Sequence, residues 1–216
     1  MGGNGKDVTY YSFHATLNGV SEKADGFYIF SRSASAVFKP DENKWTHFPM
    51  HSESNPRSRG ATVVIKDKIY LLGGYVDGTR TVTDQVDVFD AASGKFAAGV
   101  AMASARMDHG AATYGGKIYV FGGSAVMNTA IDTVEMFDPS SGKWSSKTKM
   151  PSAWAEMTNG QLPVFANGEV MIPYSYRNDR SVATSLKYDT VNDEWNEGPK
   201  MIRPVGRYVV LMGSRD

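Results

Sequence analysis

The sequence predicts an all-β protein built from four copies of one repeat, and two observations carry this prediction. Nearly the same seven residues occur twice, as KIYLLGG at residues 68–74 and as KIYVFGG at residues 117–123. An aspartate that ends a short apolar stretch also recurs, at Asp90, Asp138 and Asp189. Self-similarity with a period near fifty residues indicates a chain of stacked structural units.

A second recurring signal defines where each repeat ends. In every repeat a large aromatic residue is followed within a few positions by a methionine. These pairs are Trp45 with Met50, Phe96 with Met102, Trp144 with Met150, and Trp195 with Met201. The repeats therefore run over about 8–50, 51–102, 103–150 and 151–201, after residues 1–7, which we expect to be flexible.

The third repeat shows the four strands that we expect in each copy. Residues 110–114 are small and apolar, residues 117–121 are apolar on both faces, and residues 133–138 form a shorter third strand. Residues 143–150 alternate in the manner of a half-exposed strand. No segment keeps a helical period. The second strand of each repeat is predicted at 27–30, 68–72, 117–121 and 169–172.

A lone sheet of this kind would expose two apolar faces to water. Stacking four such sheets around a common axis covers those faces, which is the arrangement of a β-propeller. The glycine pairs after the second strands allow unusual backbone angles and the close approach of a neighbouring backbone. Each repeat is therefore expected to form one antiparallel, four-stranded blade.

The two central repeats resemble the kelch-repeat β-propeller family. In the third repeat the resemblance rests on Arg106, His109-Gly110, KIYVFGG, FDPSSGKW and Met150. In the second repeat it rests on Arg57, Gly60, KIYLLGG, VFDAASGKF and Met102. The resemblance covers residues 8–212, and it implies a kelch-type propeller whose common role is to bind another protein.

The end repeats depart from the family pattern. Repeat one has Ser31-Arg32 where the glycine pair is expected and Lys39 where the aspartate is expected. In repeat four we place Pro173-Tyr174 at the glycine pair and Val170 at the tyrosine. These departures keep the blade assignment but change the expected turns.

The number of blades is open on sequence grounds. Residues 206–212, GRYVVLM, have the pattern of an innermost strand, which would either complete blade one or begin a further blade. Repeat one also has a candidate first strand of its own within residues 7–17. The alternatives are a closed four-bladed ring or part of a larger propeller, with self-association through the end blades as a way to cover their faces.

Composition and motifs give little support to catalysis. Lysine plus arginine and aspartate plus glutamate both number 23, so nothing favours nucleic acid or a membrane as partner. There is no cysteine, which fits a cytoplasmic location and excludes thiolate ligands. We find no nucleophile elbow and no phosphate loop. We predict no enzyme activity, no cofactor and no metal, and a packed, hydrogen-bonded role for His109.

The arginines are unevenly placed along the repeats. The loops between second and third strands lie on the same face as the links between blades, and nine of the ten arginines fall in those segments, whereas none of the thirteen lysines does. A guanidinium binds carboxylates with two parallel hydrogen bonds and stacks on aromatic rings. These arginines are Arg32, Arg57, Arg59, Arg80, Arg106, Arg177, Arg180, Arg203 and Arg207.

We therefore predict that this loop face binds a protein partner, with an acidic or polar peptide segment as the ligand. Its predicted contact residues are Arg59, Arg80, Arg106, Trp154, Tyr176, Arg177, Arg180 and Arg203. A competing hypothesis is that acids in the same segments neutralise these arginines, three of which (Arg57, Arg106 and Arg203) belong to the repeat itself. Two further hypotheses are a small-ligand or sugar-processing enzyme working in the central channel, and a structural subunit of an assembly.

Overall fold

The protein folds entirely into β-strands and turns within the residues that the structure describes. The computed structural model describes residues 13–17, 25–30, 35–48, 57–127, 129–155, 157, 162–173, 175–177, 180–182 and 184–200. No α-helix occurs in these ranges, so none there is long and apolar enough to cross a membrane. The predicted all-β class is confirmed.

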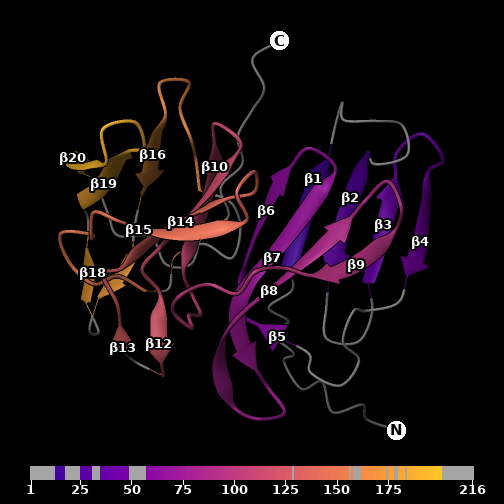
Figure 1. The fold of residues 1–216 in the computed structure, drawn as a ribbon, viewed down its shortest axis with the longest axis horizontal. Helices are drawn as coiled ribbons and strands as arrows, with labels where there is room; N and C mark the ends of the chain where they lie inside the picture. The colour runs from indigo at the N-terminus through magenta and orange to yellow at the C-terminus, as the bar shows by residue number, and fades with distance from the viewer. Residues whose placement is uncertain are drawn as a thin grey trace, which may run out of the picture.

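The first two sheets are complete antiparallel blades (Figure 1). Blade 1 consists of β1 (Phe13–Leu17), β2 (Gly26–Phe30), β3 (Ser35–Lys39) and β4 (Lys44–Phe48). Blade 2 consists of β6 (Ala61–Ile65), β7 (Lys68–Val76), β8 (Thr81–Asp90) and β9 (Lys95–Ala98), with β5 (Arg57–Ser58) added to the end of β7. Repeat one therefore has a first strand of its own.

Blade 3 repeats this pattern, and blade 4 modifies it. Blade 3 consists of β10 (Gly110–Tyr114), β11 (Lys117–Phe121), β14 (Val134–Asp138) and β15 (Lys143–Lys147). Blade 4 has three strands among its described residues, β16 (Glu169–Ile172), β19 (Thr184–Asp189) and β20 (Glu194–Lys200). The innermost segment of blade 4 meets β16 at one bridge, between Val164 and Val170. Pro163 has no N–H to donate there, which limits further pairing.

Three further hairpins extend from the same end of the blades. β7 and β8 simply continue past the body of blade 2. Blades 3 and 4 carry separate two-stranded hairpins between their second and third strands. These are β12 (Ser124–Val126) with β13 (Thr129–Ala130), and β17 (Ser175–Arg177) with β18 (Arg180–Val182). All four second strands lie where the sequence predicts them.

The recurring aspartate closes the turn between the third and fourth strands. Asp90 accepts hydrogen bonds from the backbone N–H and hydroxyl of Ser93, at 2.8 and 2.9 Å. Asp138 does the same with Ser140, at 2.9 and 2.6 Å. The bonds from Ser93, together with Lys68, lower the pKa of Asp90 to about 2. In blade 1 this position is held by Lys39, which donates instead to the carbonyl of Asp25 at 2.6 Å.

The glycine pairs mark the places where the chain entering the next blade crosses. The N–H of Gly74 donates to the carbonyl of Arg106 at 2.8 Å, and that of Gly123 donates to the carbonyl of Trp154 at 2.8 Å. A Cβ on Gly73 would collide with the same Arg106 carbonyl. Glycine is therefore required here for close backbone approach, as its repetition indicates.

Successive blades also share backbone hydrogen bonds near the axis. The N–H of Asp108 donates to the carbonyl of Arg59 at 2.7 Å, and the N–H of Met157 donates to the carbonyl of Asp108 at 3.1 Å. These three residues occupy equivalent positions 49 residues apart in repeats two, three and four. The same bond thus ties blade 3 to blade 2 and blade 4 to blade 3.

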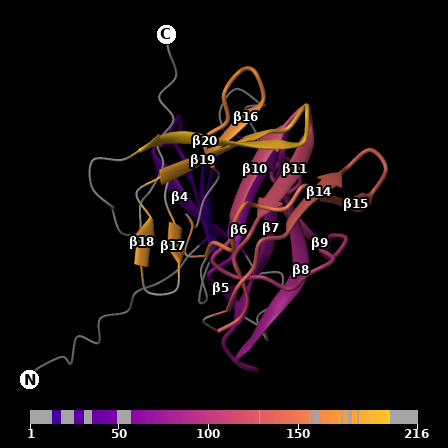
Figure 2. The same cartoon turned by 90° about the vertical axis from the view of Figure 1, so that its left-hand side faces the viewer.

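The four blades form an open arc. In Figure 1 blade 1 and blade 4 lie at opposite ends, with blades 2 and 3 between them. Figure 2 shows both end blades on one side of the two middle blades. The described blades therefore match an open array instead of a closed four-bladed ring. Residues 206–212, the predicted closing strand, lie outside the described residues.

The register of blade 4 corrects one detail of the repeat alignment. Val170 pairs with Tyr188 as Ile118 pairs with Phe137. Val170 therefore takes the place of the isoleucine, and Met171 takes the place of the tyrosine, so the placement of Val170 at the tyrosine was wrong. By the same register Pro173 takes the place of Phe121, so its placement at the first glycine of the pair was wrong too. A slip of one residue matters because it moves every side chain to the opposite face of the strand.

Candidate protein-interaction face

The hairpins between second and third strands gather on one face of the arc. β12, β13, β18 and the far ends of β7 and β8 all point toward the lower edge in Figure 1, and Figure 2 shows β17 and β18 there too. We call the exposed part of these hairpins the hairpin face. It is the face on which the sequence places its arginines.

Arg80 lies at the tip of the β7–β8 hairpin. Its side chain is exposed, and it has no ion-pair partner among the described residues. Its backbone is left-handed, with φ of 58°, which is unusual for a residue other than glycine. Of the predicted contact residues whose side chains are described, Arg80 best matches the expected exposed position.

Arg106 is instead completely buried, with 0% of its surface exposed. Its guanidinium donates to the carbonyl of Gly122 at 2.8 Å and to the side chain of Thr133 at 3.1 Å, and it pairs with Glu135. Glu135 also accepts a bond from the N–H of Ala103 at 2.7 Å. Arg106 therefore holds blade 3 together, and it does not belong to the hairpin face.

Arg57 has the same structural role in blade 2. It donates to the carbonyls of Gly73 at 3.1 Å and Gln85 at 2.8 Å, and it pairs with Asp87. The hypothesis that this arginine belongs to the repeat is thus supported in both central blades. Its acidic partners were missed because they lie in the third strands instead of the loops. The sequence does contain a signal for these partners, because an acid stands three residues before the turn aspartate in both repeats, as Asp87 and Glu135.

Arg59 joins two blades. It binds Asp108 with two parallel hydrogen bonds, of which the one from Nε measures 2.9 Å, and 20% of its side chain stays exposed. Its Nη1 also reaches the sulfur of Met127 at 3.4 Å. Arg59 therefore lies at the base of the hairpin face with its charge already paired.

Trp154 is buried, with 3% of its surface exposed. Its ring belongs to the core between blades 3 and 4, and its indole N–H donates to the hydroxyl of Ser152 at 2.8 Å. Its carbonyl accepts the bond from Gly123, the role that Arg106 has in the preceding repeat. Trp154 packs the core instead of the surface.

The remaining predicted residues lie on or beyond the β17–β18 hairpin. Arg177 and Arg180 are paired directly across it, and Tyr176 is paired with Ser181. This pairing is the last one described before the two strands are joined, so both arginine positions lie at the same end of the hairpin. Arg203 lies outside the described residues.

An apolar element of this face was missed by the sequence analysis. Val126 and Met127, at the tip of the β12–β13 hairpin, are 58% and 49% exposed. The sequence could have indicated this element, because Val126 and Met127 are adjacent apolar residues in a segment predicted to be a solvent-exposed loop. Together with Arg59 below them, they place apolar and cationic groups side by side.

His109 is packed but not hydrogen-bonded as predicted. It is fully buried, and neither ring nitrogen has a hydrogen-bond partner among the described residues. Burial, followed by the nearby charge of Arg106, lowers the pKa of His109 well below its usual value of 6.5. The ring is therefore neutral, and it is closed off from any ligand at the surface.

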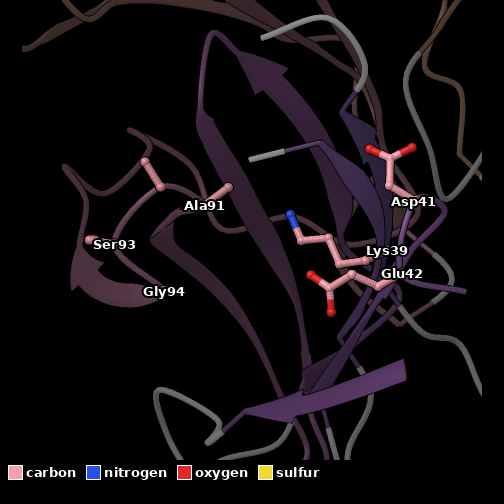
Figure 3. Close-up of a pocket in the computed structure, with 7 residues that line it drawn as sticks. Lys39, Asp41, Glu42, Ala91, Ser93 and Gly94 are labelled. Carbon is pink, nitrogen blue, oxygen red and sulfur yellow. The ribbon is translucent and has the colours of Figure 1, made fainter. Parts of the chain in front are cut away.

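A crevice lies on the opposite face, between blades 1 and 2 (Figure 3). It is lined by the β3–β4 turn, with Lys39, Asp41 and Glu42, and by the β8–β9 turn at 91–94. Lys39 and Glu42 point toward the second turn in Figure 3. Within the described part of the chain, no group of three or more His, Asp or Glu residues is arranged to hold a metal ion.

Comparisons with known proteins agree with this architecture. A family model described as the KLHDC2/KLHL20/DRC7 Kelch-repeats domain matches residues 17–212. No curated protein matches the chain. Among solved structures, one titled "Structure of YjhT" is similar with a TM-score of 0.74 and 15% sequence identity, over 91% of this chain and 67% of that one. At that identity the similarity concerns the fold alone.

Proposed function

Because the chain belongs to the family of the KLHDC2/KLHL20/DRC7 Kelch-repeats domain, we propose that it is a protein-interaction module that binds through its hairpin face. The ligand is an acidic or polar peptide segment of a partner protein. The observation that carries the proposal is the projection of hairpins from blades 2, 3 and 4 on one side of the arc.

The residues at the tips of these hairpins have the composition of a binding site. Arg80 supplies a guanidinium that is unpaired within the described residues. Val126 and Met127 supply apolar surface, and Arg177 and Arg180 occupy the tip of the third hairpin. Arginine next to well-placed apolar groups is typical of interaction hot spots.

The proposal assigns the arginines two separate roles. Arg57 and Arg106 are committed to buried pairs, and Arg59 is paired with Asp108. The proposed contact set is therefore Arg80, Arg177 and Arg180 with Val126 and Met127. Tyr176 remains in the proposal as a neighbour of this set, and Arg59 as its base.

The test uses an array of peptides of equal length that are acidic, neutral or basic. We expect the acidic peptides to bind best, and their binding to weaken as salt is added, because rim charges act through screened fields. Replacing Arg80, Arg177 and Arg180 together by glutamate should weaken the best binder by at least about tenfold. Unchanged binding by the folded triple variant would remove the hairpin face from consideration.

A matched control distinguishes the effect of the protein's overall charge from the effect of where the substituted residues lie. The triple variant Lys66→Glu, Lys95→Glu and Lys143→Glu makes the same change in charge on described residues outside the hairpins. We expect it to keep most of the peptide affinity. An equal loss in both variants would show that only overall charge matters.

We also propose that the protein has no enzyme activity. His109 is fully buried and cannot reach a ligand at the surface, and the crevice beside Lys39 brings two carboxylates, Asp41 and Glu42, together without a histidine. A stoichiometric transition metal in protein purified without added metal would contradict this prediction. The search for a site would then begin in the central channel.

A further inference from the structure

The three junctions between blades use the same face of each following blade. Tyr28, Phe30 and Phe48 of blade 1 form one core cluster with Ile69, Phe89 and Phe96 of blade 2. Ile118, Phe137 and Trp144 of blade 3 pack in the same way on blade 2, and Val170, Tyr188 and Trp195 of blade 4 pack on blade 3. Each following blade thus presents two strand residues and one outer aromatic ring to the blade before it.

The outer aromatic ring also makes a recurring hydrogen bond. The indole N–H of Trp144 donates to the carbonyl of Val100 on blade 2, and that of Trp195 donates to the carbonyl of Thr148 on blade 3, both at 2.9 Å. Both acceptors lie four residues after the outer aromatic of their own blade. The indole N–H of a tryptophan at this position therefore finds its acceptor in a carbonyl that follows the outer aromatic of the preceding blade.

Blade 1 carries the same face, but no described blade covers it. By register, Phe27, Phe38 and Trp45 are the counterparts of Ile118, Phe137 and Trp144. Trp45 packs on Phe38 and Phe27, with ring centres 5.3 and 6.3 Å apart, and is 44% exposed. Its indole N–H has no hydrogen-bond partner among the described residues.

Blade 4 holds the matching acceptor at the other end of the arc. β20 has a register irregularity, which places Lys200 opposite Thr184. Thr184 is the counterpart of Thr133, which the blade 3 register places opposite Thr148, so the carbonyl of Lys200 corresponds to those of Val100 and Thr148. Blades 1 and 4 lie at opposite ends of the arc, so these two blades of one chain do not meet (Figure 1).

We propose that the outward face of blade 1, formed by Ile29, Phe38 and Trp45, docks on blade 4 of a second copy of this chain. The contact follows the arrangement of the three internal junctions, with the indole N–H of Trp45 donating to the carbonyl of Lys200 of the second copy. Met171, which follows Val170 on β16, lies on the opposite face of blade 4 and meets the aromatic face. Such a head-to-tail contact closes into a ring or continues, depending on its rotation.

The primary measurement is mass in solution by light scattering, over about a hundredfold range of concentration. We expect a mass of two or more chains at the upper end and of one chain on dilution. A single-chain mass throughout would overturn the proposal. So would a multimer whose mass is unchanged by the variants described next.

Two substitutions of Trp45 should weaken the contact between the two copies to different degrees. Trp45→Glu places a charge in the aromatic face and should raise the dissociation constant at least about a hundredfold. Trp45→Phe copies the Phe96 of blade 2, keeps the packing, removes the donor, and should raise the constant about fivefold. Val126→Glu changes another exposed apolar residue, on the hairpin face, and should leave self-association unchanged.

A mixing experiment identifies which surfaces meet. Met171→Glu damages the blade 4 side and should also reduce self-association when measured alone. A mixture of the Trp45→Glu and Met171→Glu chains retains one intact junction, so we expect it to form a two-chain complex. If Met171→Glu associates like the unchanged chain, the contact is between two blade 1 faces, and the head-to-tail proposal is wrong.

Folding of each variant is checked by its thermal transition. If Trp45→Glu does not fold, Trp45→Gln takes its place, and Met171→Gln replaces Met171→Glu in the same way. Peptide binding to the hairpin face is measured in parallel. Because the two surfaces share no residue, loss of self-association with intact peptide binding separates this proposal from the proposed function.

Discussion

The buried arginines of blades 2 and 3 and the exposed arginine of the β7–β8 hairpin show two uses of one residue type. Arg106 is wholly enclosed, paired with Glu135 and bonded to the carbonyl of Gly122. Arg80 is exposed, lies at a hairpin tip and has a left-handed backbone. The first is fixed by the fold, whereas the second has no described partner within it.

What separates the two is the position of the nearest acid. A carboxylate three residues before the turn aspartate lies on the third strand and reaches the arginine that enters the same blade, as Asp87 and Glu135 do. Arg80 forms no ion pair with an acid in the part of the chain that the structure describes. The comparison predicts that changes near Arg106 act on stability, whereas changes at Arg80 act on binding.

The largest effect is expected when Arg106 alone is removed. Arg106→Met leaves Glu135 buried without its countercharge, and breaking a buried pair from one side costs about 3–5 kcal/mol. The free energy of unfolding by denaturant measures this. Arg80→Met is the matched control, and we expect it to change that free energy by no more than about 0.5 kcal/mol.

The partner substitution sharpens this result. Arg106→Met combined with Glu135→Leu removes both charges, and it should recover much of the lost stability because an apolar pair avoids the desolvation cost. If the double variant is as unstable as the sum of both single variants, the hydrogen bonds to Gly122 and Thr133 dominate over the charge pair.

The next largest effect is expected at Gly73, which lies between the two buried arginines. Its carbonyl accepts from Arg57, and a Cβ on it would collide with the carbonyl of Arg106. Gly73→Ala should therefore lower the free energy of unfolding by about 1–3 kcal/mol more than Gly94→Ala. Gly94 is the control because its φ of 69° is similar to the 55° of Gly73 and no atom lies within 4 Å of its added Cβ.

Equal losses in the two alanine variants would contradict this. In that case only the left-handed backbone angle, which both glycines share, would matter. The close passage of the neighbouring blade would then contribute nothing measurable, and the repeated glycine pair would need another explanation.

Much of the fold follows from local patterns in the sequence. The repeated KIY-x-x-GG segment identifies the second strands, since its apolar residues are buried on both faces and its glycines admit the crossing chain. The turn aspartates are equally local, because each bonds to residues two or three positions ahead. These features need no knowledge of distant segments of the chain.

The candidate site could be predicted only partially. Loop position alone groups Arg59, Arg80 and Arg106 together. Arg59 and Arg106 differ from Arg80 because they pair with acids that lie about thirty to fifty residues away in sequence. Trp154 illustrates the same limit, since it fills a gap between two blades that no single repeat defines. Pairing across blades is a property of the assembled arc.

A smaller effect, dependent on pH, is expected from His109 beside Arg106. The pKa of His109 is lowered by burial and by the charge of Arg106, so the unfolded chain binds a proton more readily than the folded chain does. This contribution to stability is complete above the unfolded pKa of about 6.5. It is lost as the pH falls below that value, by up to about 1.4 kcal/mol per pH unit.

The measurement is the free energy of unfolding from about pH 7 to pH 5. His109→Asn should flatten this dependence relative to the unchanged chain. Identical slopes for the two proteins would mean that the ring becomes protonated without disturbing the fold.

The smallest effect on stability is expected at Arg80, where the direction of the change in the free energy of unfolding shows whether the side chain supports the hairpin. A left-handed backbone costs an L-residue about 1–2 kcal/mol, and glycine avoids that cost. Arg80→Gly should therefore leave the free energy of unfolding unchanged or raise it by up to about 1 kcal/mol. In the peptide array the same variant should bind the acidic peptides more weakly. If Arg80→Gly is clearly destabilised, the guanidinium supports the hairpin itself, and Arg80 belongs with Arg106 among the structural arginines.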